Sequence, residues 1–541
     1  MALTLLGCLA VGSGTGLTGG LISCSPQPSP ETVRPLSGAE AQRLAIMRVT
    51  NYRDGRAGLH ATIGPPGAET EVTGGVDWGR QLVYLTVGGS GAGEYRGLLQ
   101  SVPGLVATRP ADPPATSPEP GGSPPTDITP PPELTPPPGL TPPPVLPPGD
   151  GWRVRRWDTS DPTNSPLDSF LALVFAAAAD RPDRPEALER SEARWLGTDH
   201  AGGARVDVLL GPAVPQSTWD VERSSPAPTS LAAMGGAVRY WLDADARLHR
   251  LEALLGENVA AQVDLDRSAK PELRAVAALG GAPVRPRPVT SGEAEQLAEV
   301  PATNRARGGA TISLAVPTLP ATDLQPGTGP AVNLRGAGWV DWYSDIAYLT
   351  VHEIDEPSRE MLLRADPIGV AMRSTTGRAT DDGPAPTGTT PGTGRTEPEP
   401  AERARSGKPD DTELPPLPPP TERNWAYLEW RDRADNLGGL DIDLLVGEAF
   451  AMGDRAADDA ARLRRSAVWL RRDVVHGTKV TVFEMPKAPE AGTPRGQARM
   501  RYWIDSTGLL RRLELRTRTG AFAQLDLFPG EVPALPWVPT G

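Results

Sequence analysis

The sequence contains only two cysteines among its 541 residues, and both lie within the first 24 positions. Residues 25–541 therefore offer no disulfide, no cysteine-based zinc site and no cysteine nucleophile. Histidine is also scarce: there are five, and no two stand at an HxxxH or HExxH spacing. A histidine metal site would need ligands gathered from distant parts of the chain, so the sequence predicts neither a metal nor another cofactor.

Aromatic residues make up only 5% of the chain, and the net charge is -13. An acidic chain without a basic stripe is a poor candidate for a nucleic-acid partner, so we expect none. After the N-terminal leader no apolar run reaches the roughly 18 residues of a membrane-spanning helix. Glycine and proline are abundant instead, at 59 and 62 residues. This composition indicates modest cores separated by much non-globular chain.

The leader, residues 1–24, is uncharged up to its end and closes with Leu-Ile-Ser-Cys. This ending resembles the lipobox of bacterial lipoproteins, which implies that Cys24 carries a lipid and anchors the protein to the outer face of the cytoplasmic membrane. Residues 25–36, rich in proline, would then form a tether. The leader lacks the basic start typical of a secretory signal. A cleaved signal or an uncleaved anchor, without lipid, stays open as the alternative.

One two-strand unit occurs twice. Residues 238–243 read VRYWLD and residues 248–252 read LHRLE, while residues 500–505 read MRYWID and residues 510–514 read LRRLE. Tyrosine, tryptophan, aspartate, arginine and glutamate thus recur 262 positions later. Self-similarity at this distance indicates a duplicated domain.

Other matches give the extent of the duplication: residues 76–78 (VDW) recur at 340–342, and residues 84–87 (YLTV) recur at 348–351. We place the first repeat at 37–285, with a proline-rich insertion at 110–150, the second repeat at 286–530, with a Pro/Gly/Thr-rich insertion at 374–420, and a tail at 531–541.

Each repeat follows the same predicted order of elements. Ser37 and Glu40 have the spacing of a capping box and open a helix. Residues 82–87 alternate like a strand, and residues 167–179 are apolar almost all round, as in a buried helix. We therefore predict an α+β fold: two tandem copies of a curved antiparallel β-sheet, a half-open barrel, wrapped around helices. The proline-rich insertions are predicted to be disordered.

The chain shows no GxSxG elbow and no paired catalytic spacing. Its recurring carboxylates are Asp77 with Asp341 and Asp243 with Asp505. Asp243 and Asp505 end a strand before a turn, where aspartate commonly bonds its own backbone, whereas Asp77 and Asp341 are placed to pair with an arginine across the strand. We expect the protein not to be an enzyme.

The lipobox, the helix followed by strands, the buried helix and the late Tyr-Trp-x-Asp hairpin resemble actinobacterial lipoproteins of the LppX/LprG type, which have a LolA/LolB-like fold. The resemblance covers both repeats. It implies a half-open barrel that holds acyl chains of lipids or lipoproteins between sheet and helices. The matching apolar positions, and so the predicted ligand-binding residues, are Val83, Leu85, Val87, Val206 and Val208 in the first repeat and Ala347, Leu349, Val351, Val480 and Val482 in the second.

The leading hypothesis is a cell-surface lipoprotein with two lipid-carrier-like domains that bind acyl chains or lipidated molecules in apolar cavities. The alternative is an envelope scaffold or protein-interaction module with the same fold but fully packed domains. A hydrolase using paired carboxylates is the third reading, and it would need two such groups within roughly 5–10 Å of each other.

Overall fold

The computed structural model describes most of both repeats. Cys24, the leader and most of the tether lie outside the described residues, as do the central parts of both insertions, so the predictions for these segments stay predictions. The described residues are 32–111, 140–157, 165–190, 193–212, 237–255, 259–318, 332–355, 360–374, 414–419, 425–429, 441–454, 457–485, 494–535 and 537.

The first repeat folds around one open, fully antiparallel sheet of 12 strands, with the order β1-β8-β9-β10-β11-β12-β2-β3-β4-β5-β6-β7. Along the chain, β1 lies at one end of the sheet, the strands β2–β7 form the opposite half, and the chain then returns to β8 beside β1. The strands are β1 (Arg34–Pro35), β2 (Arg56–Ile63), β3 (Thr70–Asp77), β4 (Leu82–Gly88), β5 (Gly97–Val102), β6 (Leu105–Pro110), β7 (Arg153–Arg156), β8 (Arg194–Ala201), β9 (Ala204–Pro212), β10 (Ala237–Leu242), β11 (Leu248–Leu255) and β12 (Val259–Asp266).

The second repeat has its own 12-stranded antiparallel sheet, which repeats the order of the first strand for strand: β13-β20-β21-β22-β23-β24-β14-β15-β16-β17-β18-β19. Its strands are β13 (Arg287–Pro288), β14 (Gly309–Thr318), β15 (Val332–Asp341), β16 (Ile346–Glu353), β17 (Glu360–Ala365), β18 (Gly369–Ser374), β19 (Ala426–Glu429), β20 (Val468–Val475), β21 (Thr478–Glu484), β22 (Met500–Asp505), β23 (Leu510–Arg516) and β24 (Phe522–Gly530). The predicted fold class, two tandem curved antiparallel sheets with helices, is confirmed.

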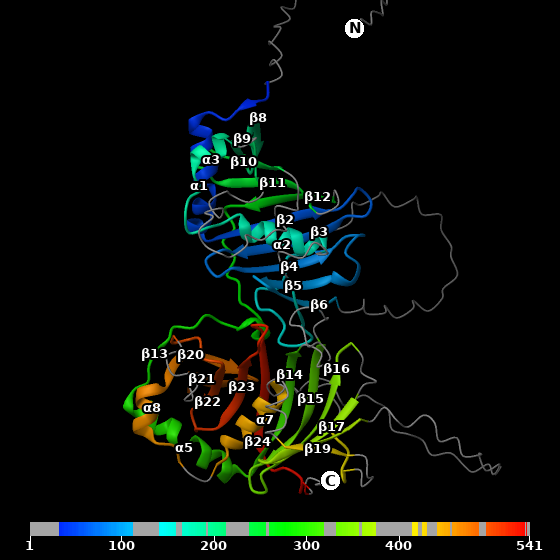
Figure 1. Cartoon of the computed structure of the whole chain (residues 1–541), viewed down its shortest axis with the longest axis vertical. Coiled ribbons are helices and arrows are strands. Elements are labelled where there is room, and N and C mark those ends of the chain that lie inside the picture. Colours follow the sequence, from blue (N-terminus) through cyan, green and yellow to red (C-terminus); the bar gives the residue numbers. More distant parts are fainter. Residues whose placement is uncertain are drawn as a thin grey trace, which may run out of the picture.

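Helices lie against one face of each sheet, and the two domains follow one another along the long axis in Figure 1. In the first repeat they are α1 (Gly38–Asp54), α2 (Pro166–Ala176) and α3 (Pro185–Arg190), with the short 3₁₀ turns η1 (Gly93–Tyr95) and η3 (Ala277–Leu279). In the second they are α5 (Ser291–Arg307), α7 (Asp441–Ala451) and α8 (Ala460–Ser466).

The first helix of each repeat begins with a complete capping box. The Ser37 hydroxyl accepts from the backbone N–H of Glu40 at 3.4 Å, and the Glu40 carboxylate accepts from the backbone N–H of Ser37 at 2.8 Å. Thr290 and Glu293 make the same pair of bonds at 3.3 and 2.8 Å. Two of the unpaired N–H groups at each helix start are thereby satisfied, which defines where the helix begins.

The main core of each repeat lies between the sheet and its helices. In the first repeat it joins Leu44 of α1 and Phe170 of α2 to Leu59 and Leu85 of the sheet, all of them buried. The apolar helix predicted at residues 167–179 is α2, and it is buried on nearly all sides because it lies inside the curve of the sheet. We call this side of each sheet the helix-facing side and the other side the outer face.

Candidate functional site

The ten predicted ligand-binding residues do not lie on one surface. Six of them belong to the core on the helix-facing side: Val83, Leu85, Val87, Ala347, Leu349 and Val351. The other four lie on the outer face, packed around the hairpin tryptophans Trp241 and Trp503: Val206, Val208, Val480 and Val482. Ligand binding by these residues stays a prediction, but the set is split between the two sides of each sheet.

The split arises because successive side chains of a strand point to opposite faces. In β9 the residue that reaches the helix-facing core is Leu209, the odd-numbered neighbour of Val208, and in β21 it is Phe483, the neighbour of Val482. Strands with apolar residues on both faces give no alternation from which the inner face could be read. Val206, Val208, Val480 and Val482 therefore lie on the outer face, and their neighbours face the helices.

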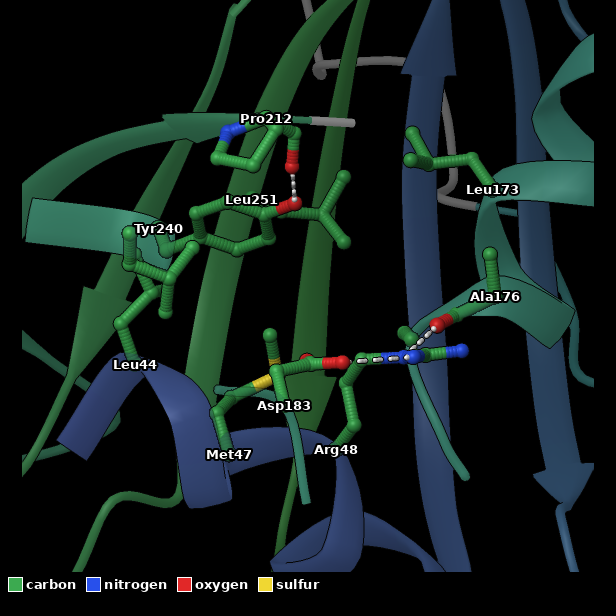
Figure 2. Close-up of a pocket in the computed structure, with 11 residues that line it drawn as sticks. Leu44, Met47, Arg48, Leu173, Ala176, Asp183, Pro212, Tyr240 and Leu251 are labelled. Atoms are coloured by element: carbon green, nitrogen blue, oxygen red, sulfur yellow. Dashed lines mark hydrogen bonds and ion pairs between the residues drawn. The ribbon is translucent and has the colours of Figure 1, made fainter. Parts of the chain in front are cut away.

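The space between sheet and helices in the first repeat contains a cavity of about 20 Å³. Figure 2 shows it between Leu44 and Met47 of α1, Leu173 of α2 and the strand residues Tyr240 and Leu251. Such a volume holds about one water molecule, whereas ligand pockets usually span roughly 300–1,000 Å³. Side chains therefore fill the space immediately around this void. A separate pocket of about 510 Å³ lies at the end of the two helices, between Tyr52 of α1, Phe175 of α2 and the turn at residues 78–81.

The polar groups beside this void are paired with the protein. The Tyr240 hydroxyl donates to the Pro212 carbonyl at 2.8 Å, and burial raises the pKa of this phenol above its usual range. Arg48 donates to the Ala176 carbonyl at 2.7 Å and pairs with Asp183 at 3.3 Å. These contacts connect α1 to the end of α2 and to the segment after it, so they hold these three elements together beside the void.

Each repeat also uses a buried asparagine, which the sequence analysis did not single out. Asn51 in α1 donates to the Ala177 carbonyl at 2.7 Å, and Asn304 in α5 donates to the Met452 carbonyl at 2.7 Å. Asn304 additionally accepts from the backbone N–H of Leu510 at 3.1 Å. The two asparagines stand 14 residues after the matching capping residues Ser37 and Thr290. This equal spacing in both repeats is the sequence signal that could have identified them.

The tryptophans of the repeated VDW motif have a similar role. The indole N–H of Trp78 donates to the Val174 carbonyl at 3.0 Å, and that of Trp342 donates to the Ala449 carbonyl at 2.9 Å. Both indoles thus bond backbone near the end of the buried helix. They position α2 and α7 and are part of the scaffold.

Three of the four recurring aspartates act as the sequence analysis expected. Asp77 pairs with Arg56 on the neighbouring strand at 2.9 Å. Asp243 accepts from the backbone of its own turn, and so does Asp505, whose carboxylate accepts from the N–H of Thr507 at 2.8 Å. Asp341 instead accepts from the backbone N–H of Tyr343 at 2.8 Å, because the residue opposite it is Gly309 and not an arginine.

The two repeats touch each other through an edge strand. The side chain of Asn333 in β15 bonds both backbone groups of Val154 in β7, accepting from its N–H at 2.8 Å and donating to its carbonyl at 3.1 Å. Arg335 donates to the Trp152 carbonyl at 3.3 Å, and Arg153 pairs with Asp355 at 2.8 Å. The edge of the first sheet is thereby covered by the second repeat.

The linker between the repeats, residues 267–286, extends this contact. Leu273 and Val276 pack with Tyr84 on the outer face of the first sheet, and Ala521 of the second repeat belongs to the same apolar cluster. Further along, Arg501 donates to the Gly280 carbonyl at 3.3 Å. We call the contact made by β7, the linker and the second repeat the inter-repeat interface.

A pocket of about 600 Å³ lies at this interface, within the size range of small-molecule sites. The linker and the proline segment before β7 form one wall, and the outer face of the second sheet forms the other. We call it the interface pocket. Its charged, histidine and indole side chains are Asp150, Arg274, Arg335, Arg471, Asp473, His476, Trp503, Arg512 and Asp526.

Ion pairs order the second-sheet wall of the pocket. Arg471 donates to Asp473 at 2.8 Å and to the linker carbonyl of Ala282 at 2.7 Å. Burial acts to raise the pKa of Asp526, but Arg512 and His476 outweigh it and lower that pKa to about 2. His476 lies 2.7 Å from this carboxylate. Both aspartates of this wall are therefore neutralised by basic side chains of the same repeat.

A buried carboxylate lies behind this wall. Glu514 is fully buried, and burial raises its pKa although Arg501 and Arg512 act in the opposite direction. The nearest cationic nitrogen, on Arg501, is 3.7 Å away. The matching Glu252 of the first repeat is only partly buried and pairs with Arg239 at 3.4 Å.

Among the described residues, no group of three or more histidine, cysteine, aspartate or glutamate side chains could hold a metal ion. No helix within these same ranges is long and apolar enough to cross a membrane.

No family model and no curated protein matches the chain. Solved structures that resemble it include the Pseudomonas aeruginosa MucA/MucB complex, at 10% identity over 60% of this chain and 87% of that chain, with a TM-score of 0.18. A second MucB–MucA(peri) structure covers 60% and 86% at 10% identity and a TM-score of 0.17. A putative outer membrane lipoprotein-sorting protein domain from Vibrio parahaemolyticus covers 43% and 91% at 11% identity and a TM-score of 0.16. These TM-scores are too low for any of these structures to indicate a function for this chain.

Proposed function

We propose that the protein is a membrane-anchored, non-catalytic interaction module of the cell envelope, built from two packed curved-sheet domains. The observation that supports this most is the filled space between sheet and helices in the first repeat, where the cavity is about 20 Å³. A preformed carrier of acyl chains needs a cavity many times larger in that place. The larger pockets lie elsewhere, one of about 510 Å³ beside the ends of α1 and α2 and one of about 600 Å³ between the repeats.

The anchoring part of the proposal rests on the sequence. A lipid on Cys24 would hold the chain at the outer face of the cytoplasmic membrane, and residues 25–36 would separate the first domain from the bilayer. Replacing Cys24 by serine should move the protein from the membrane fraction to the soluble extracytoplasmic fraction. Retention of Cys24→Ser at the membrane would contradict a lipid anchor.

The second candidate is the lipid carrier, favoured by the apolar lining of the void in Figure 2. In that case α1 or α2 must move away from the sheet before an acyl chain enters. Such a movement would break the Arg48–Ala176 and Asn51–Ala177 contacts, both 2.7 Å long. The carrier therefore predicts an open state that is absent from the packed arrangement.

Native mass spectrometry separates the two candidates. The protein is purified from its own membrane and weighed under native and denaturing conditions, alongside Cys24→Ser, so that a covalent anchor is told apart from a bound lipid. The packed module predicts the same mass under both conditions for Cys24→Ser. A lipid that is present in the native spectrum and lost on denaturation would establish the carrier and refute the packed module.

A further inference from the structure

The two repeats are built alike at the place where their first helix and their buried helix end beside a turn. In each repeat the backbone N–H of the VDW tryptophan donates to the carbonyl of the glycine that caps the first helix, at 2.8 Å in the first repeat and 2.9 Å in the second. The turn residues Gln81 and Asp345 both have a positive φ, of 52° and 54°. Together with the equivalent asparagine and indole hydrogen bonds, these contacts establish which residues correspond. The equivalent residues are Tyr52 and Arg305, Gly79 and Tyr343, Gln81 and Asp345, and Ala178 and Gly453.

In the second repeat the guanidinium group of Arg305 occupies this place. It donates to the Gly453 carbonyl at 3.1 Å and to the Tyr343 carbonyl at 3.3 Å. It also pairs with the carboxylate of Asp345 at 3.2 Å, and its side chain is 12% exposed. One cation thereby joins the end of the buried helix to the turn.

The first repeat has the same frame without the arginine. Tyr52 stands at the position of Arg305 and is 43% exposed, and Gly79 stands at the position of Tyr343. The pocket of about 510 Å³ lies here, within the size range of small-molecule sites. We call it the helix-end pocket. Gly79 and Ala178 both line it, and they are the counterparts of the two residues whose carbonyls bind Arg305.

The helix-end pocket combines negative charge with aromatic surface. Tyr52 belongs to the last turn of α1 and Phe175 to the last turn of α2, so the C-terminal ends of two helices adjoin the pocket. A helix C-terminus carries a partial negative charge that favours cations. The carboxylate of Asp180 lies in the lining as well. The rings of Tyr52 and Phe175 add faces on which a guanidinium group can stack.

Two arginines near the helix-end pocket already have partners in the protein. Arg80 lines the pocket, but it donates to the linker carbonyl of Leu273 at 2.9 Å and lies 3.8 Å from the carboxylate of Asp77. Arg267 lies 5.5 Å from the ring centroid of Trp78 and pairs with Asp54. Both guanidinium groups are therefore held by contacts other than those that bind Arg305 in the second repeat.

We propose that the helix-end pocket binds a guanidinium group from another molecule in the way that the second repeat binds Arg305. The carbonyls of Gly79 and Ala178 would accept its hydrogen bonds, and Asp180 would balance its charge. Such a group is carried by an arginine side chain of a polypeptide or by free arginine. This inference goes beyond the interaction module and does not depend on it.

The test is a ligand-detected NMR titration of the full chain with N-acetyl-arginine amide and with free L-arginine. N-acetyl-citrulline amide, in which an uncharged urea group replaces the guanidinium, is the comparison ligand. We expect saturable binding of at least one arginine compound and none of the citrulline compound. Tighter binding of the amide would assign the site to an arginine of a polypeptide, and tighter binding of L-arginine to the free compound; either result supports the site.

Two substitutions test the location of the site. Tyr52→Arg installs the residue of the second repeat and should abolish binding, because the chain then supplies the guanidinium itself. Asp180→Asn, at an exposed position after α2, should weaken binding about two- to fivefold, as expected for an exposed ion pair. Gln42→Arg is the matched control for Tyr52→Arg, since it adds the same charge at an exposed position of the same helix, and it should leave the affinity unchanged.

Four outcomes would overturn the proposal. The first is the absence of saturable binding of both arginine compounds to the unaltered chain. The second is equal binding of the citrulline compound, because the pocket would then not recognise the charge. The third is a loss of affinity in Gln42→Arg as large as in Tyr52→Arg. The fourth is unchanged affinity in Asp180→Asn, whose exposed position makes it the variant that tests the site should Tyr52→Arg not fold.

Discussion

The side chain of Asn333 does for Val154 what a neighbouring strand would do: it pairs with the backbone N–H at 2.8 Å and with the backbone carbonyl at 3.1 Å. An edge strand presents unpaired backbone groups that invite association with another chain. In the first repeat the position equivalent to Asn333 is Glu69, so this pairing is specific to the inter-repeat interface. The two domains are therefore joined by specific contacts and not by the linker alone.

Replacing Asn333 by alanine should loosen this interface. Two buried backbone groups of Val154 lose their partners, and each such loss costs roughly 1–3 kcal/mol. Guanidinium denaturation followed by tryptophan fluorescence should change from one transition to two, as the domains cease to unfold together. Glu69→Ala makes the equivalent substitution in the first repeat and should leave the curve unchanged. An unaltered curve for Asn333→Ala would show that Asn333 does not couple the domains.

The buried asparagines allow a comparison between the repeats. Asn304→Ala removes the partners of Met452 and Leu510, whereas Asn51→Ala removes the hydrogen bond to the Ala177 carbonyl and a weak one to the sulfur of Met47 at 3.3 Å. Asn304→Ala should therefore lower the free energy of unfolding by about 1–3 kcal/mol more than Asn51→Ala does. Equilibrium unfolding of both variants under identical conditions measures the difference. Equal effects would mean that the bond to Leu510 contributes nothing.

The sequence was sufficient for the fold because the duplication offered every pattern twice. The capping box at Ser37, the alternating strands and the hairpin are local signals, and they placed α1, β4 and the hairpin strands correctly. It was not sufficient for the inner face of β9 and β21, because Val208 and Leu209 are both apolar and alternation then has two solutions. The choice between them is made by packing against the helix-facing core of each repeat, which depends on the tertiary structure.

The inter-repeat interface could not be predicted for a related reason. Arg335, Arg471 and His476 are distant in sequence from the linker that they face, and no local pattern relates them. A signal was nevertheless present: these are positions where the second copy departs from the first by gaining a basic residue. This signal is confined to these three positions, since Val474 and Ser313 line the same pocket where the first copy has His200 and His60.

Acid should weaken the cap of the first helix. Hydrogen bonds from Arg34 lower the pKa of Glu40 to about 2, against burial, which acts to raise it from the reference value of 4.5. A carboxylate with a depressed pKa in the folded state stabilises the fold above its unfolded pKa, and this contribution is lost as pH falls from 4.5 towards 2. The difference in melting temperature between the unaltered chain and Glu40→Gln should shrink over this window.

A scan of melting temperature from pH 7 to pH 2 checks this. Glu293→Gln should behave alike, because Arg287 lowers the pKa of Glu293 to about 2 as well. The matched control is Glu272→Gln, since the side chain of Glu272 is 88% exposed. A difference for Glu40→Gln that stays constant across the pH range would contradict the assignment of the cap.

Truncation of a side chain that borders the void in the first repeat tests whether this space is packed core or a binding site. Leu173 in α2 borders it and is 2% exposed, so Leu173→Ala enlarges it by the volume of the lost side chain. If the space is a packed core, this substitution should lower the free energy of unfolding by about 2–5 kcal/mol, because the surroundings collapse only partly around a cavity. Leu254→Ala is the control: this leucine is 47% exposed and its truncation should have a small effect. Stability is measured by equilibrium denaturation.

A lipid carrier would respond differently to the same substitution. Its enlarged apolar cavity should bind fatty acid, so fatty acid added below its critical micelle concentration should restore the stability of Leu173→Ala. Recovery of Leu173→Ala by fatty acid would therefore count against the packed module, and an uncompensated loss would support it.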